Sequence, residues 1–331
     1  MVSRRRRALA SLAAASVLLS GCEGATGAAE AGEHMADDEP YTASGTIRMV
    51  VAMAAGGGSD RAMRIISEAI NENADGYSTV VENREGGGGA VGWSYFFSLA
   101  GQPNHLVKAE TAINTLPLQE GVELPWTFAD FTPIALFAED TRIVVAPADS
   151  PYETCADLVT AREERLAVGT SGTYGADGMV LYHLDAAGLQ ANRVPYGSSG
   201  EVMTALLGGQ LAAAPASVSS AKPYIESGDL RALCTFAEEA PADDEVLGDV
   251  TTAREQGIDG SVVIWRGVLA PPGISDAARQ FWIDEMKAAV ETDVYHAYIE
   301  TDQLIEKQLY GDDFAEYLAD YDAQIQEMFA E

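Results

Sequence analysis

The chain has 331 residues, of which 47% are hydrophobic, and a formal net charge of −31 at pH 7. This length is typical of about two domains, and the apolar content is sufficient to build packed cores. The excess of 51 acidic over 20 basic residues excludes nucleic acid as a partner, because no basic stripe is available to neutralise phosphates.

The N-terminus predicts an exported lipoprotein. Residues 4–7 are all arginine, and the apolar run that follows is too short to span a membrane, which indicates a signal peptide over residues 1–21. The run ends in LLSGC, a sequence typical of a bacterial lipobox, so we expect Cys22 to carry the lipid. An ordinary signal peptide with an accidental cysteine is the alternative.

Residues 22–45 are mostly small or acidic and lack hydrophobic periodicity, which predicts a flexible tether. We therefore expect an extracytoplasmic chain that is anchored to the cell membrane through lipidated Cys22.

Strand and helix patterns alternate through the rest of the chain. The expected strands are 46–53, 78–83, 105–110, 131–138, 141–147, 165–170, 192–196, 210–216 and 230–236. The expected helices are 59–72, 86–101, 151–162, 176–188, 199–209, 219–228 and 250–257, then a long helix from Ser275 and a final one from Gly311.

This alternation favours parallel sheets covered by helices. Two strands within 131–147 have no helix between them, and we place the crossing into a second domain there, with the return at 265–273. The prediction is an α/β fold of two doubly wound lobes with a ligand cleft between them. Lobe 1 is discontinuous, over 46–140 plus 265–331, and lobe 2 covers 141–264. Two crossings predict hinge motion.

Four loops share the order strand, turn of small residues, helix. They are AAGGGSD (54–60), GGGGAVG (86–92), GTSGTYG (169–175) and YGSSGE (196–201). Such turns lie at the carboxyl ends of parallel strands, where ligands bind, and present backbone N–H groups at the positive end of a helix dipole. Two loops from each lobe therefore predict a clamp for one anion.

The sequence contains no complete motif for nucleotide binding, for a catalytic nucleophile or for a metal site. AAGGGSDRAM has neither the lysine of a Walker loop nor the third glycine of a dinucleotide loop. GTSGT has Thr173 where a nucleophile elbow requires glycine. The four histidines fall in separate elements without metal-ligand spacing. We therefore expect no catalytic residue, no metal and no cofactor, and binding rather than catalysis.

Four side chains allow two interpretations each. Asp60 either faces a ligand group or is a helix N-terminal residue that the dipole favours, and we favour the first. Arg266 either pairs with a carboxylate or lies on the hinge surface, and we favour the second. Cys155 and Cys234 either form a disulfide, which export permits, or remain separate buried thiols, which we favour.

These motifs, in this order, resemble the substrate-binding proteins of tripartite tricarboxylate transporters, the TctC or Bug family. The resemblance runs from about residue 46 to 280, and VPYGSSGEVMTALLGGQL with YIESGDLRAL is its most specific part. It implies a class II periplasmic-binding-protein fold and a monomer that captures a carboxylate by lobe closure. It also implies delivery of the ligand to membrane permease subunits.

The resemblance implies ligand-binding residues in all four loops. They are Gly57, Gly58, Ser59, Asp60, Gly88, Gly89, Ala90, Ser171, Gly172, Thr173, Tyr196 and Ser198. Where the family commonly has acidic residues in and after the strand at 210–216, this chain has Ala212 and Ala216. Ser217 is then the nearest polar candidate, and we expect a distal pocket that is less polar than usual.

We therefore predict an extracytoplasmic solute-binding lipoprotein for an organic carboxylate, such as a di- or tricarboxylate, that works with a tripartite tricarboxylate-type permease. One alternative is a sensor subunit that presents the ligand to a signalling receptor. Another is a secreted hydrolase, which requires a nucleophile and a base within reach of each other.

Overall fold

The computed structural model describes residues 40–119, 121–161, 166–171, 175–196, 199–241 and 244–329. The expected signal peptide, Cys22 and most of the expected tether lie outside these residues. Asp37–Glu331 form one compact unit. Among the helices in the described ranges, none combines the length and the apolar content that crossing a membrane requires.

The main sheet is mixed rather than parallel. The strands are β1 (Gly45–Val51), β2 (Tyr77–Asn83), β3 (His105–Glu110), β4 (Thr132–Pro147), β5 (Ala167–Thr170), β6 (Asn192–Pro195), β7 (Ala214–Ser217), β8 (Leu230–Thr235), β9 (Val263–Ala270) and β10 (Ile305–Tyr310). The strand order in the main sheet is β10-β4-β9-β3-β1-β2, and β7 and β8 also pair with β4. The strands β5 and β6 form a separate two-stranded sheet.

Only the pairs β1–β2, β1–β3 and β5–β6 are parallel among the described ladders. The strands β4 and β9 are antiparallel to each other and to their other partners. The expectation of parallel sheets was therefore wrong for the centre of the molecule. The strands β4 and β9 cross the centre in opposite directions, so they are antiparallel to each other.

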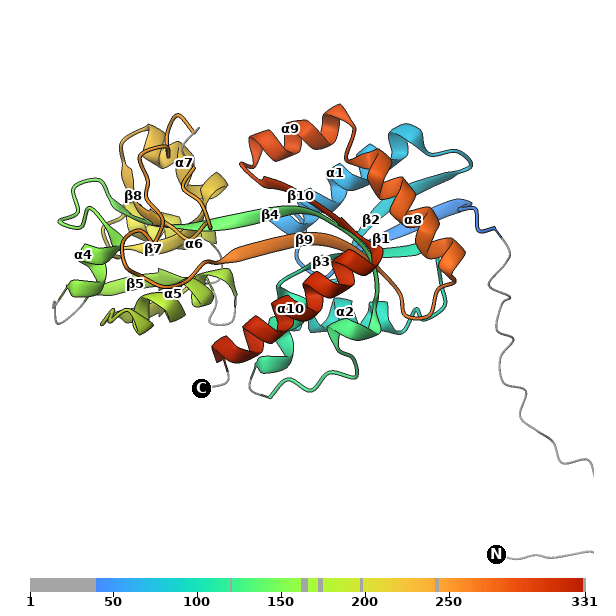
Figure 1. Ribbon diagram of the computed structural model, residues 1–331, viewed down its shortest axis with the longest axis horizontal. Helices are drawn as coiled ribbons and strands as arrows, with labels where there is room; N and C mark the ends of the chain where they lie inside the picture. The colour runs from blue at the N-terminus through green and yellow to red at the C-terminus, as the bar shows by residue number, and fades with distance from the viewer. Residues whose placement is uncertain are drawn as a thin grey trace, which may run out of the picture. The chain divides into compact units, whose positions relative to one another are not determined.

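A single long strand, β4, replaces the two strands expected within 131–147. Residues 132–141 pair with β9, whereas residues 142–147 pair with β7 and β8. Figure 1 shows β4 and β9 side by side, between the group of β5, β7 and β8 and the group of β1, β2 and β3. The exact limits of the two lobes stay a prediction.

Helices cover the sheets as the hydrophobic patterns predict. The helices longer than one turn are α1 (Gly58–Asn73), α2 (Ala90–Phe97), α3 (Ala112–Thr115), α4 (Cys155–Thr160), α5 (Ala176–Ala186), α6 (Ser199–Leu207), α7 (Val218–Glu226), α8 (Asp276–Ala289), α9 (Asp293–Thr301) and α10 (Gly311–Phe329). Short 3-10 turns lie at Gly87–Gly89, Leu116–Leu118 and Phe128–Asp130. The apolar face expected on α1, with Met63, Ile66 and Ile70, is fully buried.

Two C-terminal expectations were wrong. The expected helix at 250–257 forms turns, in which Thr252 bridges to Thr235 of β8. The expected long helix after Ser275 is divided into α8 and α9, and the strand β10 follows it. The residues of β10 are exposed or half-buried, so its sequence IEKQLY carries little hydrophobic pattern that could predict a strand.

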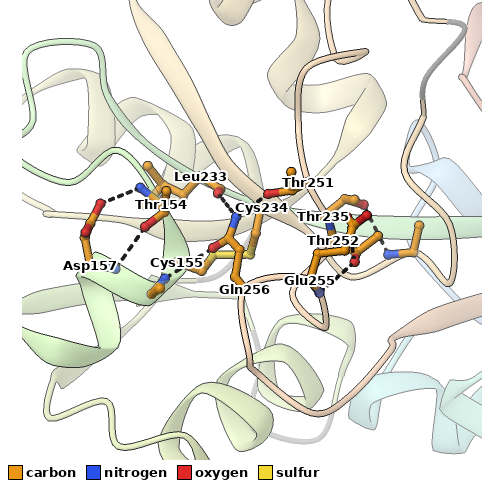
Figure 2. The surroundings of a disulfide bond; sticks show 12 residues. Thr154, Cys155, Asp157, Leu233, Cys234, Thr235, Thr251, Thr252, Glu255 and Gln256 are labelled. Carbon is orange, nitrogen blue, oxygen red and sulfur yellow. Dashed lines mark hydrogen bonds between the residues drawn. A yellow bond between two sulfur atoms is a disulfide. The ribbon is translucent and has the colours of Figure 1, made fainter.

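Cys155 and Cys234 form a disulfide that joins α4 to β8 (Figure 2). The side-chain amide of Gln256 lies beside the disulfide and connects the same two elements. It accepts a hydrogen bond from the Ala156 amide and donates one to the Leu233 carbonyl, at 3.2 and 2.8 Å. The favoured interpretation of two separate thiols was therefore wrong. Both cysteines are buried, so burial alone did not distinguish the two alternatives.

Candidate functional site

The sheet brings the four expected loops together in two pairs. β1 lies beside β2, so the loops 54–60 and 86–92 are neighbours, and the Asn83 side chain donates to the Met53 carbonyl across them. β5 lies beside β6, and the Tyr196 amide donates to the Thr170 carbonyl at the start of the other two loops. Each pair therefore lies at the carboxyl ends of adjacent parallel strands, as expected.

The helices that follow three of these loops begin without a side-chain cap. α1, α2 and α5 start after Gly57, Gly89 and Gly175, none of which can cap with a side chain. By contrast, four helices elsewhere are capped by a side-chain oxygen, from Thr154, Ser217, Ser275 and Thr292. The first turns of α1 and α5 contain Asp60 and Asp177, whereas the first turn of α2 contains no acidic residue, so the positive end of the α2 dipole is available for an anion.

The second loop depends on glycine for its backbone. Gly86, Gly87, Gly88 and Gly89 all have positive φ, between 57 and 136°, a region that side chains disfavour. Close packing begins just beyond, because a Cβ on Gly92 would lie 2.6 Å from the Ala52 Cα. The end of this loop at Gly92 therefore packs directly against the backbone of Ala52, just after β1, whereas Gly89 faces the side chains of Met53 and Trp93.

The first loop contacts a buried ion pair on β3. The Ser59 hydroxyl donates to the Glu110 carboxylate at 2.8 Å, and Lys108 Nζ donates to the same carboxylate at 2.6 Å. The Lys108 side chain is only 1% exposed, and burial lowers the pKa of Lys108 to about 8. Burial opposes the ionisation of Glu110, but the Lys108 ammonium and the Ser59 hydroxyl hold the pKa of Glu110 below its usual range.

A second set of charges follows the two central strands. Asp140 accepts hydrogen bonds from Arg266 and Arg142, at 2.9 and 3.0 Å on the same oxygen. Arg142 Nε lies 3.7 Å from an oxygen of Asp177 in the first turn of α5. Asp177 in turn accepts from the amide and the hydroxyl of Ser171, at 2.9 and 2.6 Å. These contacts connect the third loop to the centre of the sheet.

Arg266 also connects the centre to the first loop. A Cβ built on Gly58 would lie 3.9 Å from Arg266 NH1, the nitrogen that donates to the Tyr298 hydroxyl. The Arg266 side chain is 13% exposed. The favoured interpretation of Arg266 as a hinge-surface residue was therefore wrong, since it is a largely buried member of an ion pair.

Asp60 is held by its own loop. Its carboxylate accepts from the Gly56 amide at 2.9 Å and from Arg64 Nε at 3.0 Å, and the residue is 4% exposed. The Arg64 guanidinium, followed by the Gly56 amide, lowers the pKa of Asp60 to about 2. These contacts hold Asp60 within its own loop and in the first turn of α1, where the alternative interpretation expected it, and its contact with a ligand stays a prediction.

The low pKa of Asp60 predicts a dependence of stability on acid. A carboxyl group whose folded-state pKa lies below its ordinary value of 3.8 stabilises the fold above pH 4, and this contribution is lost as the pH falls towards 2. We expect wild type to be more stable than Asp60→Asn at pH 6 and the difference to shrink between pH 4 and 2. Urea unfolding at each pH measures it. A difference that does not change with pH would contradict the pKa, and Asp284→Asn on the exposed face of α8 is the control.

The structure places the remaining expected residues as follows. Ser217 caps α7 by accepting from the Ser220 amide, and it pairs directly with Arg142 across the β4–β7 ladder. Tyr196 is half-buried and lines an open cavity of about 540 Å³ together with Glu201 and Thr204. Three further expected residues lie outside the described residues, namely Gly172, Thr173 and Ser198.

The position of Ser217 brings it next to a charged residue of another strand. Residues that are directly opposite in an antiparallel ladder share a face of the sheet, so the Ser217 and Arg142 side chains are neighbours. A guanidinium therefore lies beside Ser217, and the polarity of the pocket relative to the family stays a prediction. Arg142 belongs to a different strand from Ala212 and Ala216, so it was not visible from their neighbourhood in the sequence.

Sequence reasoning missed Lys108, Glu110, Asp140, Arg142 and Asp177. Two signals were available. Lys108 is one of four lysines in the chain and lies in an otherwise apolar strand core, HLVKAE. The segment AEDTRIVV places three charges inside the longest strand pattern. Buried charges in strands are costly unless they are paired, so such positions point to a site or an ion-pair network.

This arrangement suits the binding of an anion rather than catalysis. It combines uncapped helix N-termini with guanidinium and hydroxyl donors. Within the described ranges there is no group of three or more His, Cys, Asp or Glu side chains placed to hold a metal ion.

Comparison with known proteins agrees with this geometry. A family model described as tripartite tricarboxylate transporter family receptor matches residues 62–328. A UPF0065 protein encoded in the gbd 5' region of Cupriavidus necator is 29% identical over 254 residues, which cover 75% of this chain and 76% of the relative.

Two solved structures are similar in fold. One is a TctC solute binding protein from Polaromonas, with a TM-score of 0.73, 23% identity and coverage of 87% of this chain and 98% of that one. The other is an R. palustris protein with adipate, with a TM-score of 0.74, 20% identity and coverage of 86% and 97%. These similarities confirm the predicted fold class.

Proposed function

The chain belongs to the tripartite tricarboxylate transporter family of receptors, and on this premise we propose that it captures an organic carboxylate, such as a di- or tricarboxylate, for a membrane permease. The family consists of periplasmic solute receptors rather than enzymes. The observation that carries the proposal is the contrast between the helices. Three of the helices that follow the expected binding loops, α1, α2 and α5, lack side-chain caps, whereas α4, α7, α8 and α9 have them.

In the proposed mechanism the ligand enters between the two lobes and the lobes close on it. The backbone amides around Gly57 and Gly58 and those of the second loop hold one carboxylate. The strongly negative chain slows the approach of an anion, so the amide field must dominate within a Debye length of about 8 Å. The closed form then docks on the permease subunits. Bending of β4 and β9, which connect the two groups of strands, would permit the closure.

We also propose that the mature protein is a lipoprotein anchored through Cys22. The LLSGC sequence supports this, and the Cys155–Cys234 disulfide supports an oxidising compartment outside the cytoplasm. Incorporation of labelled palmitate that is lost in Cys22→Ser would support the anchor, and recovery of the wild-type chain entirely in the soluble fraction would contradict it.

A thermal-shift screen against di- and tricarboxylates, aromatic acids, amino acids and sugars tests the ligand class. A ligand at 100 times its Kd stabilises the fold by about 2.7 kcal/mol. We expect stabilisation by at least one carboxylate. Stabilisation by a sugar, and by none of the acids, would refute the proposal.

The variant Gly58→Val tests the first loop. Its added methyl groups would extend from the start of α1 towards Arg266, and we expect the affinity for the carboxylate to fall about 100-fold or more. The fold should tolerate the change, because the nearest atom to the new Cβ is the end of a side chain at 3.9 Å. Isothermal titration calorimetry measures the affinity.

The matched control for this variant is Asp276→Val, at the first residue of α8, whose N-terminus is capped by Ser275. We expect it to leave the affinity unchanged. Equal affinities of Gly58→Val and wild type would remove the first loop from the site.

A further inference from the structure

Arg142 has a hydrogen-bond donor that no part of the described chain uses. Its NH1 donates to Asp140 at 3.0 Å, but its Nε is buried without a hydrogen-bond partner among the described residues. An oxygen of Asp177 lies 3.7 Å from Nε, which is beyond hydrogen-bond range. A buried N–H without an acceptor is costly, so a structural role alone explains this geometry poorly.

Arg142 and Arg266 share one hydrogen-bonding carboxylate, that of Asp140. The same oxygen of Asp140 serves both Arg142 and Arg266, so one carboxylate neutralises two guanidinium groups. Asp177 bonds the amide and the hydroxyl of Ser171 and makes only the long contact to Arg142. We name the group of Arg142, Asp140 and Arg266 the arginine triad; its two guanidinium groups share the hydrogen-bonding carboxylate of Asp140, and Asp177 contributes a second carboxylate at the longer distance of 3.7 Å.

The triad lies between the first and the third of the expected binding loops. Arg266 is next to Gly58 at the start of α1, and Arg142 is opposite Ser217 and close to Asp177 of α5. A ligand held at the N-terminus of α1 would therefore extend towards the guanidinium groups. A guanidinium can bind a carboxylate through two parallel N–H groups, such as Nε and a terminal nitrogen.

We propose that Arg142 is a specificity-determining residue that binds a second carboxylate of the ligand, so that the receptor selects dicarboxylates over monocarboxylates. This inference rests on the proposed function, since it assumes that a first carboxylate binds at the loops. Arg266 and Asp140 hold Arg142 in position. The second carboxylate supplies the acceptor that the buried Nε lacks.

The test compares two ligands of equal length, adipate and hexanoate, by isothermal titration calorimetry on the full exported chain. In Arg142→Met we expect the affinity for adipate to fall about 100-fold and the affinity for hexanoate to change less than about threefold. In Arg142→Lys, which keeps the charge but loses the planar fork, we expect a loss of about tenfold for adipate alone. The control is Arg231→Met, which removes a half-buried arginine that donates to the Ala148 carbonyl and whose ion-pair partner Glu153 is exposed.

Removing Arg142 leaves Asp177 without its cation, which could destabilise the fold, so a second variant controls for this effect. Arg142→Met combined with Asp177→Asn removes both charges and should show the same selective loss of adipate. An equal loss for both ligands, or no loss for either, would overturn the inference while leaving the receptor function intact. So would a wild type that binds the two ligands equally well. A wild type that binds no carboxylate at all would refute the proposed function itself.

Discussion

Replacement of Cys155 and Cys234 by alanine is expected to lower the free energy of unfolding by about 4.5 kcal/mol. The disulfide closes a loop with a sequence separation of 79, and restricting so long a segment of the unfolded chain accounts for a stabilisation of this size. Both sulfur atoms are buried, so the double variant also loses packing. Chemical denaturation of the oxidised wild type and of the double variant measures the difference.

Reduced wild type is the control for the lost packing, because it keeps both side chains and lacks only the bond. A second variant, Gln256→Ala, removes the amide that bridges Ala156 and Leu233 beside the disulfide. We expect it to destabilise the oxidised protein by about 1 kcal/mol. If the double variant and the oxidised wild type unfold at the same denaturant concentration, the disulfide does not constrain the unfolded chain.

Asp140→Leu is expected to destabilise the protein by about 3–5 kcal/mol. The Asp140 side chain is 4% exposed and is the shared acceptor of Arg142 and Arg266, which are 15% and 13% exposed. Removing one partner from a buried ion pair leaves uncompensated charge, and here two guanidinium groups lose the same acceptor. Urea unfolding at pH 7 gives the free energies.

The controls separate the effect of charge from that of volume and burial. Asp140→Asn keeps the size and one acceptor oxygen, so we expect a smaller loss than for Asp140→Leu. Asp185→Leu removes the carboxylate of an exposed pair with Arg193, where we expect a change within about 0.5 kcal/mol. Equal losses for Asp140→Leu and Asp185→Leu would show that burial of the triad has no energetic consequence.

Local patterns predicted the loops of the site well. The strand at 105–110 and the helix start after Gly57 follow from hydrophobic periodicity and from glycine, which are properties of neighbouring residues. The pairing of the loops also followed, because parallel strands place their carboxyl ends at one edge. The individual ligand contacts of these loops stay predictions, including those of Gly172, Thr173 and Ser198.

Patterns failed where the partner of a residue was distant in sequence. The acidic stretch in AEDTRIVV indicated a break between two strands, yet β4 continues because Asp140 has Arg266 of β9 as its partner. Arg266 itself was assigned to the hinge surface for the same reason, since its two partners Asp140 and Tyr298 lie 126 and 32 residues away. A charged residue is read as exposed unless its partner is known.

The sequence by itself predicted that the chain is exported, and it determined that the chain has an α/β fold with glycine loops before helices and that it resembles carboxylate receptors. Each of these depends on composition or on residues close together in the chain. Only the tertiary structure decided the direction of the central strands, the pairing of Cys155 with Cys234 and the gathering of Arg142, Asp140 and Arg266. Their partners come from separate strands and helices, so strand register and packing, rather than local preference, bring them into contact.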